Sequence, residues 1–393
     1  MPFRVIFCTL IVVCFGLTGC LQNDDNGECE NGTLDILTYD ILALSEQMVD
    51  EFTETTGYCV NFIKEDDSGG ILDKMMLTKD SPQADLMIGL DNTYLQTALE
   101  NNLLTETSFK TNQNYNNISP QALESYSGPF AIPFDMGPVC LNYDERFVDG
   151  ENISIPTSLW DLTLEEWRGN MTFPSPVTSS PGRAFLVATI DYFENDDDVD
   201  TDAFDWWKAI KENDAIFTSG WTESYETHYT GGYGEYTSGY IGDAHLTVSY
   251  CQSPGVEAFY AGNYTHSTSI TIPKTTFQQI EYTGIINGAN DIDAAEAFID
   301  YLLSPEVNSN MPENNLMYSV LNNQSLPETD GYRYHSDIPE ENSDNSLICL
   351  NHALSNAGFY LKVADNYKFS KVFLNFTQII IIIFKHFYFF CFF

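Results

Sequence analysis

The architecture of this chain is set by the stretch Leu34-Asp-Ile-Leu-Thr-Tyr39, an apolar run that predicts a buried strand ending at Asp40. A second strand is predicted over Cys59-Val-Asn-Phe-Ile63, and a third over Ala84-Asp-Leu-Met-Ile-Gly-Leu90. Between the first two strands, Ser45 is a candidate N-cap for a helix with apolar residues at helical spacing. Strands that alternate with helices form βαβ units around a mostly parallel sheet, so the predicted fold class is α/β.

Polar residues follow each of these predicted strands. Tyr39 ends the first, Asp67 follows the second with Asp66 as a neighbouring option, and Asp91 follows the third. Ligands of such sheets gather at the carboxyl ends of the strands, so these residues are candidates for a binding site. Asp91 keeps a second interpretation, because an Asp at this place also serves as a helix cap.

The chain then crosses to a second α/β region and returns. Pro and Gly interrupt the extended run 131–138, which contains Asp135, a residue that suits either a structural or a binding role. From about Thr268 the chain is predicted to return to the first region. We therefore expect a hinged clamshell with a discontinuous first lobe over 34–133 and 260–350, and a second lobe over 134–259.

The composition of the 393 residues is strongly acidic. Lys and Arg total 16 against 57 Asp and Glu, which gives a net charge of −41. This charge argues against nucleic acid and anionic membrane surfaces as partners, because both repel it. It biases an open cleft toward cationic ligands, and it equally suits a monomer that stays soluble in a salty exterior.

The N-terminus has the pattern of a secreted lipoprotein. An apolar run follows Arg4, and Leu17-Thr-Gly-Cys20 matches a lipobox, so 1–20 is predicted to be a signal peptide with lipid attached to Cys20. The polar segment 21–33 is then a tether. The expected location is the extracytoplasmic face of the cell membrane.

The C-terminal segment 366–393 is rich in Phe, Ile and Lys. Its length would allow a membrane span, but Lys385 and His386 would then lie within the bilayer at a high cost. Translation past a frameshift is the alternative, and the segment is left out of the predicted fold.

Six cysteines remain after the lipobox, and none has metal-ligand spacing. In an oxidising exterior one or two disulfides are expected, with a connectivity that the sequence leaves open. We predict no metal and no cofactor. The cysteines are Cys29, Cys59, Cys140, Cys251, Cys349 and Cys391.

Seven short motifs occur in one order along the chain. They are Thr38-Tyr-Asp40, Gly89-Leu-Asp-Asn92, Pro133-Phe-Asp135, Thr178-Ser-Ser-Pro-Gly182, Ser219-Gly-Trp-Thr-Glu-Ser-Tyr225, Leu246-Thr-Val-Ser-Tyr250 followed by Ser253-Pro254, and Ser304-Pro-Glu306. The ordered set, over roughly 34–326, resembles the periplasmic thiamine-binding proteins of ABC transporters. This resemblance implies a type II binding-protein fold, no catalysis, a permease as partner, and thiamine or its phosphate esters held between two lobes.

The resemblance carries ligand contacts over to Tyr39, Asp67, Ser179, Trp221 and Tyr250. A thiazolium ring is a fixed cation, which aromatic faces and a carboxylate bind well. The three aromatic residues can supply the faces and Asp67 the charge. The loop that contains Ser179 opens a predicted helix, so its hydroxyl and N–H groups can hold the hydroxyethyl end or a phosphate.

Three aromatic positions of the family pocket are not aromatic here. They correspond to Val256, Leu316 and a position near Glu46. A Tyr-rich segment over 229–240, with Tyr233, Tyr236 and Tyr240, lies between Trp221 and Tyr250 and can refill the cleft.

Other functions stay open. A polyamine or another small organic cation suits the same residue types, whereas Cys251 after Tyr250 argues against the paired tyrosines of ferric-ion receptors. A thiamine-cleaving enzyme would need a cysteine nucleophile, for which Cys140 and Cys251 are the candidates. Common catalytic motifs are missing from the sequence, so an enzyme is not predicted.

Overall fold

The computed structural model describes residues 29–109, 114–194, 202–261, 265–270, 272 and 274–322. The predicted signal peptide with Cys20 and the 366–393 tail lie outside these residues. So do Cys349 and Cys391.

One sheet runs through both halves of the molecule, with ten strands in the described residues. Its order is β2-β1-β3-β9-β4-β7-β5-β6, and β8 and β10 pair with β4. The strands are β1 (Gly32–Tyr39), β2 (Tyr58–Glu65), β3 (Leu86–Asp91), β4 (Ile132–Asp144), β5 (Met171–Pro174), β6 (Ile216–Thr218), β7 (Leu246–Tyr250), β8 (Ser267–Ile270), β9 (Phe277–Ile285) and β10 (Tyr318–Ser319).

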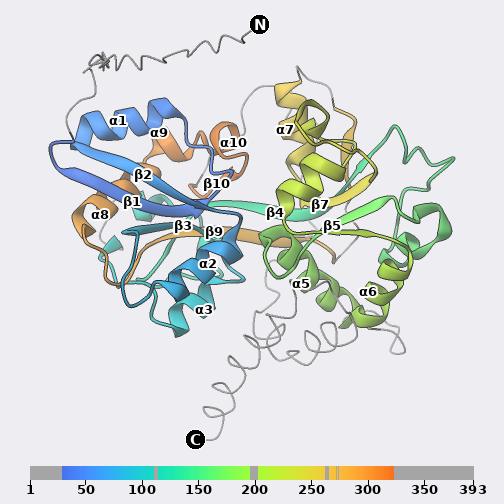
Figure 1. Ribbon diagram of the computed structural model, residues 1–393, viewed down its shortest axis with the longest axis horizontal. Helices are drawn as coiled ribbons and strands as arrows, with labels where there is room; N and C mark the ends of the chain where they lie inside the picture. The colour runs from blue at the N-terminus through green and yellow to red at the C-terminus, as the bar shows by residue number, and fades with distance from the viewer. Residues whose placement is uncertain are drawn as a thin grey trace, which may run out of the picture.

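Helices cover both faces of the sheet (Figure 1). In this view α1 and α7 lie above it, and α2, α3, α5 and α6 lie below it. The helices are α1 (Glu46–Thr56), α2 (Ser68–Leu77), α3 (Leu95–Glu100), α4 (Pro120–Leu123), α5 (Ser180–Glu194), α6 (Ala203–Glu212), α7 (Ser253–Tyr260), α8 (Ile292–Leu302), α9 (Pro305–Asn308) and α10 (Met311–Asn314).

The first βαβ unit forms as its sequence predicts. Strands β1 and β2 pair in parallel along their whole length, and β1 also pairs in parallel with β3. Helix α1 begins after Ser45, whose Oγ accepts a hydrogen bond from the Met48 N–H at 3.2 Å. It ends at Gly57, which takes the left-handed conformation with φ +74° that favours glycine. Met48 and Phe52 point into the core.

Two hydrophobic cores form on either side of the crossing strands. The first contains Phe52 and Phe298, which come from opposite ends of the described chain and have ring centroids 4.9 Å apart. The second contains Trp206 and Trp207 of α6, which are both buried. The first lobe is therefore discontinuous in sequence, as predicted.

Strands β4 and β9 connect the two cores (Figure 1). They pair antiparallel from Ile132 opposite Thr283 to Val139 opposite Phe277. Each strand places residues in both cores, so the two crossovers of the predicted clamshell are one pair of neighbouring strands. The mixed sheet with helices on both faces, joined between the lobes by β4 and β9, is the α/β clamshell that the sequence predicts.

The segment around β8 packs with the second core. Ile270 of β8 and Ile272 pack in the second core, and β8 pairs with the far end of β4. The sequence assigns 260–350 to the first lobe, and these limits stay a prediction.

Candidate ligand-binding cleft

A cavity of about 330 Å³ lies where residues of the two lobes meet. Of the eight residues predicted to bind ligand, the structure brings Tyr39, Asp66, Asp67, Trp221 and Tyr250 together on its lining. The other three, Asp91, Asp135 and Ser179, are fully buried beside the cavity and do not line it.

The side of the cavity formed by the first lobe and β9 is a hydrogen-bonded network, which we call the first-lobe wall. Tyr39 Oη donates to Glu281 Oε2 at 2.9 Å and accepts from Asn315 Nδ2 at 2.8 Å. Asn315 Nδ2 also donates to Asp135 Oδ2 at 2.6 Å. Gln279 Nε2 donates to Glu281 Oε1 and to the Tyr250 hydroxyl, both at 2.8 Å. The network ties β1, β4 and β9 together at the floor of the cleft.

Two carboxyl groups lie side by side in this network. Asp135 of β4 stands directly opposite Glu281 of β9 in the strand register. Burial raises the pKa of both groups, and the charge of Asp135 raises the pKa of Glu281 further. Two buried carboxylates this close cannot both ionise cheaply, so the pair holds a proton. Asp135 therefore lies in the strand pair that joins the lobes, where it accepts a hydrogen bond from Asn315 and faces Glu281.

Asp67 joins the two lobes at the cavity edge. It is the N-cap of α2, and its Oδ1 accepts from the Ser68 N–H at 2.7 Å. The same oxygen accepts from the Ser180 N–H at 3.3 Å, at the start of α5. Burial raises the pKa of Asp67 to about 6, although these backbone hydrogen bonds oppose the shift. Asp66 lies next to it with its side chain exposed.

Asp91 holds a loop and contacts the second lobe. Its Oδ1 accepts from the backbone N–H and the hydroxyl of Thr93, both at 2.6 Å, and its Oδ2 accepts from the Ser180 hydroxyl. In this arrangement the Asp91 side chain is enclosed by these partners and does not line the cavity. Ser179 is buried one residue before α5, where the hydroxyl is shielded from the cavity.

The opposite side of the cavity, the second-lobe wall, is aromatic. Trp221 and Tyr225 stack with ring centroids 4.8 Å apart and planes 14° apart. The Trp221 indole N–H donates to Ser249 Oγ at 2.8 Å, which fixes the ring plane. Tyr225 donates to Glu257 Oε1 at 2.9 Å. Burial raises the pKa of Glu257 to about 7, while the bond from Tyr225 opposes the shift.

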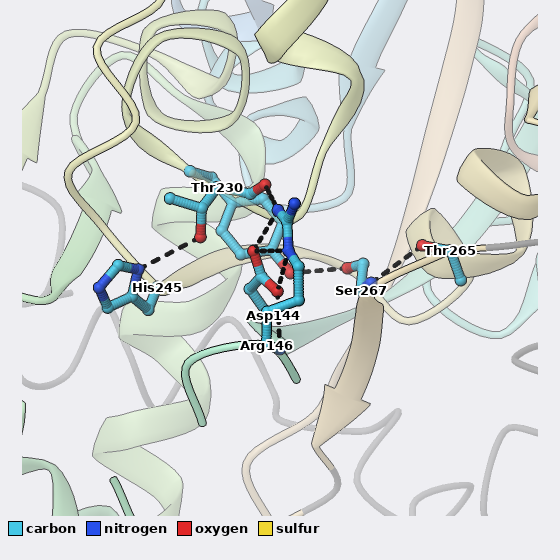
Figure 2. Close-up of polar contacts among 7 residues, drawn as sticks. Asp144, Arg146, Thr230, His245, Thr265 and Ser267 are labelled. Carbon is cyan, nitrogen blue, oxygen red and sulfur yellow. Dashed lines mark hydrogen bonds and ion pairs between the residues drawn. The ribbon is translucent and has the colours of Figure 1, made fainter. Parts of the chain in front are cut away.

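A polar cluster fixes the segment that follows Tyr225 (Figure 2). Arg146 holds Asp144 through Nε and Nη2 at 3.0 and 2.6 Å, and its Nη2 donates to the Thr230 carbonyl oxygen at 2.6 Å. The Thr230 hydroxyl lies 3.3 Å from His245 Nδ1. Burial raises the pKa of Asp144, but the hydrogen bonds from Arg146 outweigh this effect and hold the pKa below its usual value. Because Asp144 ends β4, the aromatic wall is tied to the central sheet.

The Tyr-rich segment refills the cleft only in part. Tyr233 lines the cavity and donates to Glu226 Oε1 at 2.5 Å. Tyr236 is 84% exposed, and neither it nor Tyr240 lines the cavity. Tyr225, the last residue of the predicted Trp221 motif, supplies the further aromatic face.

Of the three positions where the family pocket is aromatic and this chain is not, two line the cavity. Val256 and Leu316 line it, whereas Glu46 is exposed on α1. Leu316 has φ +61°, in the left-handed region that a leucine rarely adopts. The loop after α10 is thus held in a strained conformation at the cavity wall.

Two disulfides are present in the described residues. Cys29 pairs with Cys59, and Cys140 of β4 pairs with Cys251 after β7. The second pair contains both candidate nucleophiles of the enzyme alternative. Because a disulfide sulfur is not a thiolate, this pair cannot attack a ligand.

The sequence did not point to Glu281, Glu257 and Asn315, which also line the cavity. The signal for Glu281 was present, because one acid among Gln278, Gln279 and apolar residues is unusual in a strand that is buried throughout. Glu257 and Asn315 carry no comparable signal, since acids and amides are common in helices and loops.

The described part of the chain shows no group of residues arranged as a metal site and no helix long and apolar enough to cross a membrane.

The sheet order and the two-lobed cleft define a type II binding protein, and the comparisons agree with this class. Residues 47–318 match the family model described as bacterial extracellular solute-binding protein. The chain belongs to this family, whose members bind solutes and are not enzymes. It is therefore a solute-binding protein of an ABC transporter.

Relatives in this family are distant. The chain is 21% identical to the thiamine-binding periplasmic protein of Escherichia coli over 260 aligned residues. This alignment covers 65% of this chain and 70% of that protein. The chain is 23% identical over 278 residues to the protein of the same name from Haemophilus influenzae, covering 70% and 74%.

Solved structures of binding proteins that are named for different ligands share the fold. A periplasmic thiamin binding protein superposes with a TM-score of 0.62 at 21% identity, covering 77% of this chain and 86% of that one. A spermidine/putrescine transporter substrate-binding protein from Streptococcus pneumoniae gives 0.61 at 17% identity, covering 84% and 98%. The fold alone therefore leaves the ligand open.

Proposed function

We propose that this chain captures thiamine, or a closely similar organic cation, in the interlobe cleft and delivers it to the permease of an ABC importer. The observation that carries the proposal is the lining of the cavity. It combines the aromatic rings of Tyr39, Trp221 and Tyr250 with carboxyl groups, and among the described residues no Lys, Arg or His lines it. A delocalised cation gains about 1–2 kcal/mol from each well-placed aromatic face when it is desolvated.

Each proposed contact has a chemical role. Trp221 has one face on Tyr225, which leaves the other for a thiazolium ring. Asp67 and Asp66 supply negative charge at the cavity edge. The Tyr39 phenol stays neutral, because burial and the nearby Glu281 and Asp135 raise its pKa well above the usual value. In this proposal Cys20 carries the lipid that keeps the receptor at the extracytoplasmic face of the membrane.

The direct test is mass spectrometry of small molecules released from the purified protein, followed by calorimetric titration with thiamine. We expect thiamine in the released fraction and saturable binding of one molecule per chain. A protein that releases nothing and gives no heat with thiamine contradicts the assignment.

A polyamine is the second candidate. The carboxyl groups of Asp66, Asp67, Glu257 and Glu281 lie on different sides of the cavity, which suits an amine with a positive charge at each end. Competition between thiamine and spermidine separates the two. Displacement of thiamine only by a large excess of spermidine supports thiamine, and the reverse order supports the polyamine.

A further inference from the structure

The cavity lining has one sign of charge. In the part of the chain that the structure describes, four carboxyl groups line it, from Asp66, Asp67, Glu257 and Glu281, and no basic side chain does. A phosphate monoester carries about −1.5 to −2 charges at neutral pH. Placed in this cavity, a phosphate would meet these acids with no cation to pair with.

Helix α5 is the second place where a phosphate would be expected to bind. Its 15 residues begin at the cleft, and helix N-termini attract anions through free N–H groups. In this chain, side-chain carboxylates already occupy the N-terminus of α5. Asp67 Oδ1 accepts from the Ser180 N–H at 3.3 Å, and Asp91 Oδ2 accepts from the Ser180 hydroxyl. The next residue, Pro181, has no N–H to offer. Two carboxylates of the first lobe thus occupy the position that an anionic ligand would use.

The basic residue that follows the start of α5 does not line the cavity either. Arg183 does not line it, and its guanidinium lies 4.4 Å from the ring centroid of Tyr94. Tyr94 in turn donates to the Val177 carbonyl oxygen at 2.8 Å. This cation is held against the aromatic ring, outside the cavity.

We infer that the cleft selects the unphosphorylated cation and rejects its phosphate esters, because acids line the cavity and first-lobe carboxylates cap α5. This inference rests on the proposed function and narrows it to one ligand form. It replaces the expectation from sequence that the loop before α5 can hold a phosphate.

Calorimetric titrations with thiamine, its monophosphate and its pyrophosphate test the inference, in a magnesium-free buffer so that no metal neutralises the esters. We expect the monophosphate to bind at least about 10-fold and the pyrophosphate at least about 100-fold more weakly than thiamine, because the phosphate charge is repelled by the carboxylates of the cavity. Esters that bind within threefold of thiamine overturn the inference and leave the proposed function intact. Esters that bind while thiamine does not overturn both.

The variant Glu257→Gln removes one acid of the cavity with little change of shape. At pH 8, above the raised Glu257 pKa of about 7, we expect the ratio of thiamine to monophosphate affinity to fall by about three- to fivefold, since one unit charge is then lost near the ligand. Glu54→Gln makes the same charge change at an exposed position of α1 and should leave the ratio unchanged. An equal effect of both variants would mean that net charge, and not the cavity, sets the selectivity.

Inorganic pyrophosphate tests the inference without any assumption about the cation. No rise in the melting temperature of the full chain is expected with pyrophosphate alone, because both possible phosphate positions are acidic or filled. A saturable rise overturns the inference even if thiamine proves not to be the ligand.

Discussion

The first-lobe wall of the cleft is a network of acids and amides, whereas the second-lobe wall is a stack of aromatic rings. Glu281 and Asn315 on the first wall are fixed by hydrogen bonds to Tyr39. Trp221 on the second wall is fixed by stacking on Tyr225 and one hydrogen bond. The first wall therefore supplies most of the polar groups, whereas the second wall supplies aromatic surface together with one acid, Glu257.

Removal of the aromatic surface should have the largest effect. Trp221→Ala is expected to weaken thiamine binding about 100-fold, because a desolvated cation–π contact and buried apolar area are both lost. Trp221→Phe keeps a ring face and should lose less than about 10-fold. Calorimetry gives the affinities, and circular dichroism shows that both variants fold. Equal affinity of the Ala variant and the unchanged protein would mean that the second wall does not hold the ligand.

Removal of a charge from the first wall should have a smaller effect that depends on pH. Asp67→Asn is expected to weaken thiamine binding about 10-fold at pH 8 and much less near pH 5, since an effective dielectric constant of about 20 still leaves a close charge pair significant. The reason is that the Asp67 pKa is about 6, so the unchanged carboxyl is largely neutral at acid pH. Titrations at both pH values check this, and a loss that does not change with pH would contradict a charge role.

The stability of the ligand-free protein should fall as the pH rises. The pKa of Asp67 rises from 3.8 to about 6 and that of Glu257 from 4.5 to about 7, both through burial. The folded chain therefore keeps protons that the unfolded chain has already released, and folding becomes less favourable as the pH rises through about 4 to 7. Urea unfolding at several pH values measures the trend.

A matched pair of variants separates this local effect from general repulsion in an acidic chain. Glu257→Gln should reduce the slope of stability against pH, whereas Glu54→Gln, exposed on α1, should not. Saturating thiamine should also flatten the slope, because a bound cation stabilises the ionised carboxyls.

Restoration of an aromatic face should have the smallest effect. Leu316 lines the cavity at one of the positions where the resemblance to thiamine-binding proteins implies an aromatic residue. Leu316→Trp is expected to tighten thiamine binding about two- to fivefold, the lower range of a cation–π contact. The backbone is already at φ +61°, so the exchange adds little strain there. Weaker binding would show that the cavity has no room for a second indole.

The sequence predicted the first wall and the second wall to different degrees. Tyr39 and Asp67 follow from the rule that ligands gather at strand ends, and both line the cavity. Asp91 satisfies the same rule but caps a loop and bonds Ser180, because its strand is buried more deeply in the sheet. Strand ends thus predict which residues are near the cleft, but not which side chains face it.

The aromatic wall was found through ordered motifs for Trp221 and Tyr250, and missed for its neighbours. Tyr225 lines the cavity beside Trp221, and of Tyr233, Tyr236 and Tyr240 only Tyr233 reaches the cavity. An irregular segment has no fixed periodicity, so its sequence does not show which rings turn inward. The cluster around Arg146 and Asp144 fixes that choice (Figure 2).

Local sequence was sufficient for the elements with a strict repeat. Strand β1, helix α1 with its Ser45 cap, and the alternation of strands and helices follow from hydrophobic period and capping chemistry, which act over a few residues. The pairing of Asp135 with Glu281, and the capping of α5 by Asp67, depend on contacts between residues 146 and 113 positions apart. Such contacts form only when β4 and β9 bring the two lobes together, so the charge pattern of the cleft is a property of the folded chain.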